Sequence, residues 1–172
     1  GIDLGAHIRD IEDFPKPGIS FKDITPLLAD PGALAGAVAG LSEPFAGQGI
    51  TKVVGMEARG FIFAAPVAVA LGAGFVPVRK AGKLPWTVIR QEYQLEYGTD
   101  LLEIHEDAVT PEDRVLIVDD VLATGGTAAA TVELVGQSGA TVAALAFLIE
   151  LGFLGGRGPL GEVPVTSLVR YD

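Results

Sequence analysis

Four short apolar runs constrain the fold of this chain more than any other feature. They do not alternate apolar with polar residues, and they occupy positions 52–55, 74–78, 115–118 and 141–149. Continuous apolar strands are typical of a parallel sheet that is covered on both faces. Stretches rich in Ala, Leu and Val, each long enough for a helix, lie at 33–41, 60–71 and 127–138. This alternation predicts an α/β fold with a doubly wound, mostly parallel central sheet flanked by helices.

Length and charge limit the organisation of the chain and its partners. With 172 residues, of which 49% are hydrophobic, the chain fills one core, so we expect a single domain over 1–172. The formal net charge of −10 would repel nucleic acids and anionic membranes, and we expect neither as a partner. Because the sequence contains no cysteine, it has no disulfides, thiolate metal sites or cysteine nucleophiles.

Two stretches bear on localisation. The first four residues contain neither a basic segment nor an apolar signal core, so we expect a cytoplasmic protein, and the missing initial Met leads us to expect a trimmed start. Residues 60–78 carry no charge, and that length approaches the ~20 residues that span a bilayer. Pro66, Pro77 and the glycines within 71–74 interrupt the run. We therefore interpret it as a buried helix, a turn and a buried strand.

Two further segments fall outside the alternation. Segment 79–98 contains Pro85, Trp86 and β-branched residues but no helical period, so we interpret it as a long loop or an excursive hairpin. Loops of that length in compact domains are usually functional lids or linkers. Segment 152–161 contains five glycines without a phosphate-binding pattern, and we interpret it as a surface connection.

The most informative motif follows the third apolar run directly. It reads Asp119-Asp120-Val121-Leu122-Ala123-Thr124-Gly125-Gly126-Thr127, and a predicted helix opens at its end. Ligands of open α/β sheets bind beyond the carboxyl ends of the strands. Small residues and two glycines let successive backbone N–H groups point into one concavity, and the helix adds its positive N-terminal end. We therefore predict a phosphate monoester site at Ala123, Thr124, Gly125, Gly126 and Thr127, with both threonine hydroxyls as additional donors.

The two adjacent aspartates need a partner, because neighbouring carboxylates disfavour each other's charge. A sugar with two neighbouring hydroxyls, or a Mg²⁺ ion, supplies one. The spacing therefore suggests that Asp119 and Asp120 hold ribose hydroxyls while the turn holds the 5′-phosphate. The alternative is that the pair merely caps the helix, although one carboxylate would suffice for that. The motif is neither a P-loop nor a dinucleotide fingerprint, because the lysine of the first and the glycine spacing of the second are absent.

This stretch resembles the phosphoribosyl-pyrophosphate signature of the type I phosphoribosyltransferases, and its wording is most similar to that of the adenine enzymes. Segments 14–23, 57–61, 76–85 and 95–98 resemble segments of those enzymes in the same order, so the likeness covers nearly the whole chain. The resemblance implies the type I fold, with a small N-terminal hood at 1–30 and a mobile catalytic loop at 79–98. It also implies transfer of 5-phosphoribosyl from phosphoribosyl pyrophosphate to adenine, which gives AMP and pyrophosphate in purine salvage. A homodimer is expected, with Mg²⁺ bound mainly through the donor pyrophosphate and with no metal ligands assigned to the protein.

The cations of this acidic chain gather where a polyanionic donor needs them. Between Ala58 and Gln91 there is no Asp or Glu, whereas the stretch contains Arg59, Arg79, Lys80, Lys83 and Arg90. Chance clustering on a solvated face is the alternative, and it suits Arg90 best. The resemblance implies that Glu57, Ala58 and Arg59 form a pyrophosphate loop, that Arg79, Lys80 and Lys83 contact pyrophosphate, and that some of these reach across a dimer interface.

Proton transfer and base recognition are assigned through the same resemblance. It places Glu96 and Tyr97 in a closing lid, where Glu96 is the candidate acid/base, and we group them with Arg59 as catalytic residues. The alternative for Glu96 is a solvated hairpin carboxylate. Phe21 is expected to stack on the base, with core packing as its competing role, and Ser20 and Lys22 to lie beside the base.

The chain departs from the family pattern at two positions. Lys22 stands where adenine enzymes usually carry arginine, and Trp86 occupies a lid position that is more often small or charged. Lysine and arginine are not equivalent in the recognition of a planar group, so the base preference stays open. Two alternatives to adenine transfer are therefore kept. One is the same reaction on a 6-oxopurine such as hypoxanthine, guanine or xanthine. The other is a regulator that senses the donor without turnover, which would lack the lid carboxylate.

Overall fold

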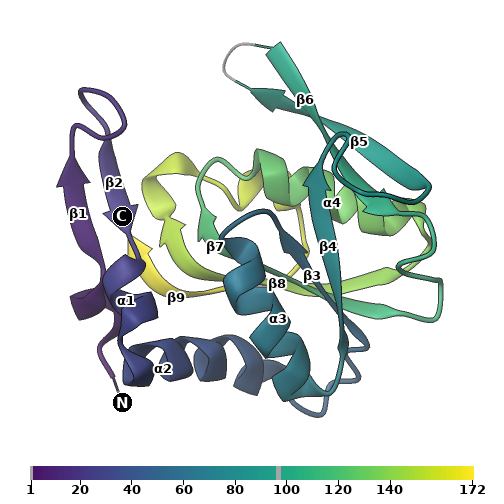
Figure 1. The fold of residues 1–172 in the computed structure, drawn as a ribbon, viewed down its shortest axis with the longest axis horizontal. Coiled ribbons are helices and arrows are strands. Elements are labelled where there is room, and N and C mark those ends of the chain that lie inside the picture. Colours follow the sequence, from purple (N-terminus) through teal and green to yellow (C-terminus); the bar gives the residue numbers. More distant parts are fainter. Residues whose placement is uncertain (1, 96–97) are drawn as a thin grey trace.

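A computed structural model describes residues 2–95 and 98–172, and its central feature is a seven-stranded sheet (Figure 1). The strand order is β5-β6-β4-β3-β7-β8-β9. The middle and one side of the sheet are parallel, from β4 through β9, whereas β6 runs antiparallel to β4 and β5 antiparallel to β6. The strands are β3 (Lys52–Met56), β4 (Gly74–Lys80), β5 (Val88–Leu95), β6 (Gly98–His105), β7 (Arg114–Leu122), β8 (Thr141–Leu151) and β9 (Val165–Tyr171). The predicted fold class, with a mostly parallel sheet, is confirmed.

Helices cover both faces of this sheet. α2 (Pro31–Ser42) and α3 (Gly60–Leu71) pack in one hydrophobic cluster with the short α1 (Thr25–Ala29), and α4 (Gly126–Gln137) packs in the cluster on the other face. All three predicted helices are present. α2 begins earlier than predicted, because the Asp30 side chain accepts a hydrogen bond from Ala33 N at 2.8 Å and Pro31 is suited to the first turn. Short 3₁₀ turns complete the fold at η1 (Leu4–His7), η2 (Glu43–Phe45), η3 (Gly152–Leu154) and η4 (Gly158–Leu160).

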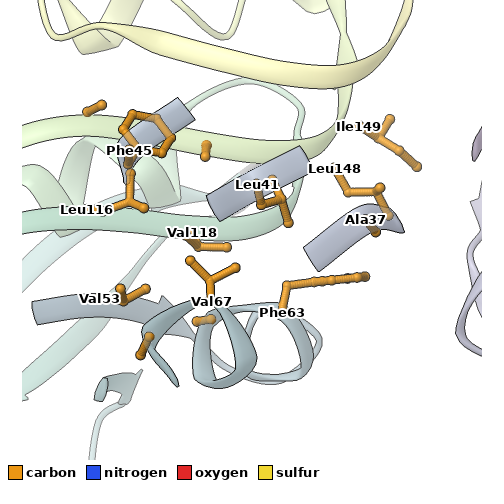
Figure 2. Close-up of a cluster of buried hydrophobic side chains, with 14 of the residues drawn as sticks. Ala37, Leu41, Phe45, Val53, Phe63, Val67, Leu116, Val118, Leu148 and Ile149 are labelled. Atoms are coloured by element: carbon orange, nitrogen blue, oxygen red, sulfur yellow. The ribbon is translucent and has the colours of Figure 1, made fainter. Parts of the chain in front are cut away.

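The core beneath α2 and α3 explains the long uncharged stretch of the sequence. Figure 2 shows Phe63 and Val67 of α3 facing Val118 of β7, with Leu41 of α2 close by. These side chains are 0–1% exposed, and fully burying such a side chain contributes roughly 1.5–3 kcal/mol. The stretch 60–78 is thus a helix, a turn and a strand, as predicted, but the helix is buried on one side only, since Val69 of α3 is 81% exposed. Within the described residues, no helix is both long and apolar enough to cross a bilayer.

Gly55 in β3 sets how closely α3 approaches the sheet. A β-carbon at Gly55 would lie 2.5 Å from the Ala64 β-carbon, so the helix rests directly on the strand. Gly60 begins α3, and a β-carbon there would lie 2.6 Å from Asp119 Oδ1. The two glycines bring the start of α3 against the strand that carries the aspartate pair.

The N-terminal residues form a small separate layer. β1 (Arg9–Glu12) and β2 (Ser20–Asp23) make a two-stranded antiparallel sheet that stands apart from the main sheet, beside the C-terminal end of the chain (Figure 1). The Lys22 ammonium lies 4.0 Å from the centre of the Tyr171 ring in β9, which ties β2 to the edge of the main sheet.

Segment 79–98 contains the end of β4, a connection at 81–87 and β5, which pairs with β6 in a hairpin that continues to His105. The hairpin that was one of the two structures expected for the segment therefore begins only at Val88. The sequence did not identify β5, β6 or β9 as strands, because their residues are mostly half-exposed and form no continuous apolar run. Glu103 of β6 is only 2% exposed, and its carboxylate accepts a hydrogen bond from Gly82 N at 2.9 Å. Arg90 of β5 forms an ion pair with the same carboxylate at 2.8 Å, so its charge links the two strands of the hairpin.

Candidate active site

The predicted phosphate site follows β7, and this strand extends four residues further than the sequence suggested, to Leu122 instead of Val118. β7 pairs with β8 as far as Leu122, so Asp119 and Asp120 lie within the strand and do not follow it as predicted. Pairing of β3 with β7 ends at Val118, which leaves the aspartates beyond the neighbouring strand. The turn after Leu122 borders a small cavity of about 100 Å³ that is lined by Ala123, Thr124, Gly125, Gly126 and Thr127 together with Asp119 and Phe147.

Gly125 is required at this turn for two reasons. Its φ angle is +90°, a left-handed conformation that side chains rarely adopt, and a β-carbon there would lie 2.2 Å from the Gly156 carbonyl oxygen. α4 begins directly afterwards at Gly126, and within residues 2–95 and 98–172 no side chain caps its first turn. The alternative in which Asp119 and Asp120 cap the helix is therefore wrong, and the amides of the first turn stay available to an anion.

The aspartate pair is held by the backbone and by one arginine. Asp119 Oδ1 accepts a hydrogen bond from Asp120 N at 2.8 Å, and Asp120 Oδ1 accepts one from Val121 N at 2.9 Å. Arg59 Nε lies 2.9 Å from Asp120 Oδ2, which is buried and lacks an aligned hydrogen-bond donor. Burial, followed by the charge of Asp120, raises the pKa of the Asp119 carboxyl well above its ordinary value. The pair is thus short of positive partners, as expected of a site that receives hydroxyls or a cation.

A second cavity adjoins the first and joins three distant parts of the chain. Its volume is about 390 Å³, and its walls come from β2, from the loop after β3 and from the end of β7. It brings together most of the predicted site residues, namely Ser20, Phe21, Lys22, Glu57, Ala58, Arg59, Asp119, Asp120, Ala123 and Thr127. The cavity is also lined by three apolar residues that were not predicted, Ile19, Val121 and Leu151. Their sequence context does not distinguish an apolar residue that lines a cavity from one that packs in the core.

Arg59 lines this cavity and contacts two of its other residues. Its guanidinium carbon lies 5.4 Å from the centre of the Phe21 ring, so it links the aspartate pair to the aromatic side chain from β2. Phe21 also makes an edge-to-face contact with Phe14, with ring centres 5.2 Å apart. The Phe21 ring is half-buried at the edge of the cavity, where a planar ligand has access to it.

The predicted pyrophosphate residues converge on Glu57, after which the chain forms a cis peptide to Ala58. Arg79 Nε lies 3.4 Å from one carboxylate oxygen of Glu57, which also accepts a hydrogen bond from Lys80 N at 2.7 Å. The Lys83 ammonium pairs with the other oxygen. Burial raises the pKa of Glu57, but the contacts with Lys83, Lys80 and Arg79 outweigh it and hold the pKa below its ordinary value. The cations are therefore gathered as predicted, with a carboxylate at their centre.

The polar groups of β2 are engaged within the N-terminal layer. Ser20 Oγ donates to Glu12 Oε1 at 3.1 Å, and the Lys22 ammonium pairs with Asp10 besides facing Tyr171. Lys22 thus lines the cavity while its charge is directed to β1 and β9. Glu96 and Tyr97, the expected lid residues, lie outside the described residues.

A third cavity, larger than these two, lies elsewhere. It measures about 750 Å³ and is bordered by α2 and α3, with Glu43 as the one charged residue in its lining. A phosphorylated ligand finds no cation there, so chemistry places the site at the end of β7 instead.

Comparison with known proteins agrees with this geometry. Residues 24–159 match the family described as Phosphoribosyl transferase domain. The chain is 60% identical over 165 residues to a protein of Thermobifida fusca named adenine phosphoribosyltransferase, and the match covers 96% of this chain and 94% of that protein. A protein of Nitrosococcus oceani with the same name is 61% identical over 168 residues, with 98% of each chain covered.

Solved structures give the same result. The adenine phosphoribosyltransferase of Rhodothermus marinus superposes with a TM-score of 0.93 at 56% identity, covering 98% of this chain and 96% of the other. That of Saccharomyces cerevisiae, solved with adenine and an imino-altritol bisphosphate, has a TM-score of 0.91 at 44% identity, with 96% of each chain covered. On sequence, fold and site together, the chain belongs to the phosphoribosyltransferase family, among the adenine phosphoribosyltransferases.

Proposed function

We propose that this protein catalyses the Mg²⁺-dependent transfer of 5-phosphoribosyl from phosphoribosyl pyrophosphate to adenine, giving AMP and pyrophosphate in cytoplasmic purine salvage. One observation supports it most: a phosphate-sized cavity at the turn after β7 adjoins a larger cavity that carries two aspartates, an arginine and an aromatic ring. These are the groups that a sugar phosphate with a pyrophosphate and an incoming base requires. The names of relatives at about 60% identity point to the same reaction.

The donor is assigned along the cavities from one end to the other. In this proposal the 5′-phosphate accepts hydrogen bonds from the amides of Thr124, Gly125, Gly126 and Thr127, where the positive end of α4 adds to the attraction. Asp119 and Asp120 accept hydrogen bonds from the two ribose hydroxyls. These contacts fix the sugar at both ends and leave its anomeric carbon facing the larger cavity.

The leaving pyrophosphate is assigned to the cationic side of the site. Arg59 and the backbone after Glu57 lie at the cavity wall, Arg79 and Lys83 pair with the Glu57 carboxylate, and the backbone N–H of Lys80 donates to it. The residues that the structure describes include no group of three or more His, Cys, Asp or Glu side chains arranged to hold a metal ion. In our proposal Mg²⁺ enters on the donor, and when bound it would neutralise charge on the departing pyrophosphate.

The base and its proton complete the assignment. In this proposal Phe21 offers its half-buried aromatic face to adenine, and the backbone near Ser20 reads the edge of the base. Glu96, with Tyr97 beside it, is proposed to accept the proton that the purine nitrogen loses, on the strength of the family resemblance. Positioned proton transfer of this kind typically contributes ~10²–10⁴-fold to a rate. We further propose that the enzyme acts as a homodimer.

One experiment tests the reaction and the choice of base. The protein is incubated with Mg²⁺, the donor and one of adenine, hypoxanthine, guanine or xanthine, and the nucleotide formed is measured. AMP as the dominant product is expected. A preference for a 6-oxopurine would contradict the assignment of the base, and no nucleotide with any base would contradict the enzymatic function and favour a sensor.

A pair of variants tests the division of roles within the site. Glu96→Ala should slow turnover while the donor still binds, whereas the double variant Asp119→Ala with Asp120→Ala should weaken donor binding. Equal loss of donor affinity in the two proteins would contradict the assignment of Glu96 to proton transfer.

A further inference from the structure

The glycine segment, residues 152–161, lies directly against the phosphate turn and is more than a surface connection. Gly156 in its centre is buried. A β-carbon at Gly156 would lie 2.5 Å from the Ala123 carbonyl oxygen, and one at Gly125 would lie 2.2 Å from the Gly156 carbonyl oxygen. The backbone at Gly156 therefore packs directly against the backbone at Ala123 and Gly125, and a methyl group fits at neither glycine.

A buried carboxylate anchors this segment. Glu150, near the end of β8, is 2% exposed, and both of its oxygens accept hydrogen bonds from Arg157, at 2.8 and 2.7 Å. Ser167 Oγ donates to it at 2.8 Å, and Arg170 Nη1 lies 3.3 Å away. Paired hydrogen bonds between a guanidinium and a carboxylate fix distance and orientation together, so the residue next to Gly156 is held in one place. The Arg157 contact, which outweighs the effect of burial, also lowers the pKa of Glu150.

We propose that Glu150 and Arg157 are positioning residues for the sugar-phosphate site, and that they act by pressing Gly156 against the backbone at Ala123 and Gly125. The inference rests on the proposed function of the turn. Backbone amides cannot reorient toward an anion independently of the backbone that carries them. The affinity of such a site therefore depends on the position in which the surrounding structure fixes the turn. Gly156 provides the rigid surface behind it. Segment 152–161, which the sequence suggested was a surface connection, thus supports the turn of the phosphate site from behind.

Two variants and one matched control test this inference. Gly156→Ala adds a methyl group against Ala123, whereas Gly158→Ala makes the same change two residues later, where nothing lies within 4 Å. Arg157→Lys keeps the charge but removes the paired geometry, and because this side chain is 47% exposed the variant is expected to fold. Binding of ribose 5-phosphate is measured by calorimetry, and the steady-state constants are measured for the donor and for adenine.

The expected results separate positioning from general damage. Gly156→Ala should raise the Kd for ribose 5-phosphate by ~10–100-fold and Arg157→Lys by ~3–10-fold, with the donor KM following. The kcat at saturating donor and the KM for adenine should stay within about twofold of the parent values, and Gly158→Ala should match the parent throughout. A purely structural role would lower the melting temperature and the active fraction without raising the donor KM.

The outcomes also separate this inference from the proposed function. If the parent protein binds ribose 5-phosphate and Arg157→Lys binds it equally well, the positioning role is refuted, whether or not Gly156→Ala folds. An equal loss in Gly158→Ala would refute it too, because that methyl group touches nothing. If the parent protein itself binds no ribose 5-phosphate, the assignment of the turn to a sugar phosphate is refuted as well.

Discussion

Replacing Gly55 with alanine is expected to destabilise the protein through helix α3. The new β-carbon would lie 2.5 Å from the Ala64 β-carbon and 3.2 Å from Phe75 Cε1. Carbon atoms in contact are normally about 3.5–4.0 Å apart, so the helix and the strand must separate by ~1 Å. Ala64 cannot give way by changing a rotamer, because its β-carbon is fixed to the helix backbone, and movement of the Phe75 ring would relieve only the longer of the two contacts. The strain must therefore move α3 as a body.

The size of the effect follows from the cost of overfilling a packed core. Extra carbon atoms in such cores typically cost about 1–3 kcal/mol. For a chain of 172 residues, each kcal/mol corresponds to about 2–4 °C in Tm, so a decrease of ~3–10 °C is expected. The donor KM should rise as well, because α3 begins at Gly60, which abuts Asp119 and follows Arg59.

Thermal and urea unfolding, with the donor KM measured in parallel, provide the test. Gly136→Ala in α4 is the matched control, because a β-carbon there meets nothing within 4 Å. Replacing an exposed helical glycine by alanine should stabilise the control by up to ~1 kcal/mol, so the two variants should differ in sign. A Gly55→Ala protein with the parent Tm and the parent donor KM would refute the reasoning.

Two further predictions concern the charges of the site. Asp119→Asn should raise Tm by roughly 2–4 °C at pH 7, because the folded pKa of Asp119 lies above its unfolded value and its ionised form opposes folding. This gain in Tm should disappear as the pH falls below the unfolded pKa of Asp119, because the carboxyl is then protonated in both the folded and the unfolded state. A gain that persists at low pH would contradict this mechanism. The variant should also bind the donor more weakly. Glu57→Gln should strengthen binding of inorganic pyrophosphate by ~3–10-fold, because Arg79 and Lys83 lose their competing carboxylate. Weaker pyrophosphate binding in calorimetry would mean that Glu57 mainly positions these cations.

Local signals in the sequence were enough to identify the helices and the central strands. A buried strand is predicted by the apolar run 115–118, because parallel strands are covered on both faces. A tight turn is predicted by the glycines at 125 and 126, because glycine adopts backbone conformations that other residues avoid. The hairpin of β5 and β6 gave no such signal, because most of its residues are half-exposed or exposed and the buried part of β6 is interrupted by the charged residue Glu103.

Contacts between distant segments could not be predicted from the sequence. Nothing at Gly156 indicates that its carbonyl meets Gly125, and nothing at Lys22 indicates that its ammonium faces Tyr171. Likewise Glu57 was assigned to the pyrophosphate loop without its ion pairs, because Arg79 and Lys83 reach it only once β3 and β4 lie side by side. Such partners depend on the fold, whereas the elements themselves depend mainly on local residue type.

The arrangement of charge in the site has a consequence for donor selection. Arg59 is paired with Asp120, and Arg79 and Lys83 are paired with Glu57, so a ligand gains these cations only by competing with carboxylates. A single phosphate at the turn after β7 leaves the Glu57 cluster untouched and gains nothing from it. A ribose that carries phosphate at one end and pyrophosphate with Mg²⁺ at the other reaches both places, and only such a ligand offsets the cost of separating the ion pairs. In the proposed reaction, the acidic residues of the site therefore contribute to selectivity at its cationic side. A ligand that occupies only that side, such as inorganic pyrophosphate, must separate the ion pairs without gaining the contacts at the turn that the complete donor makes.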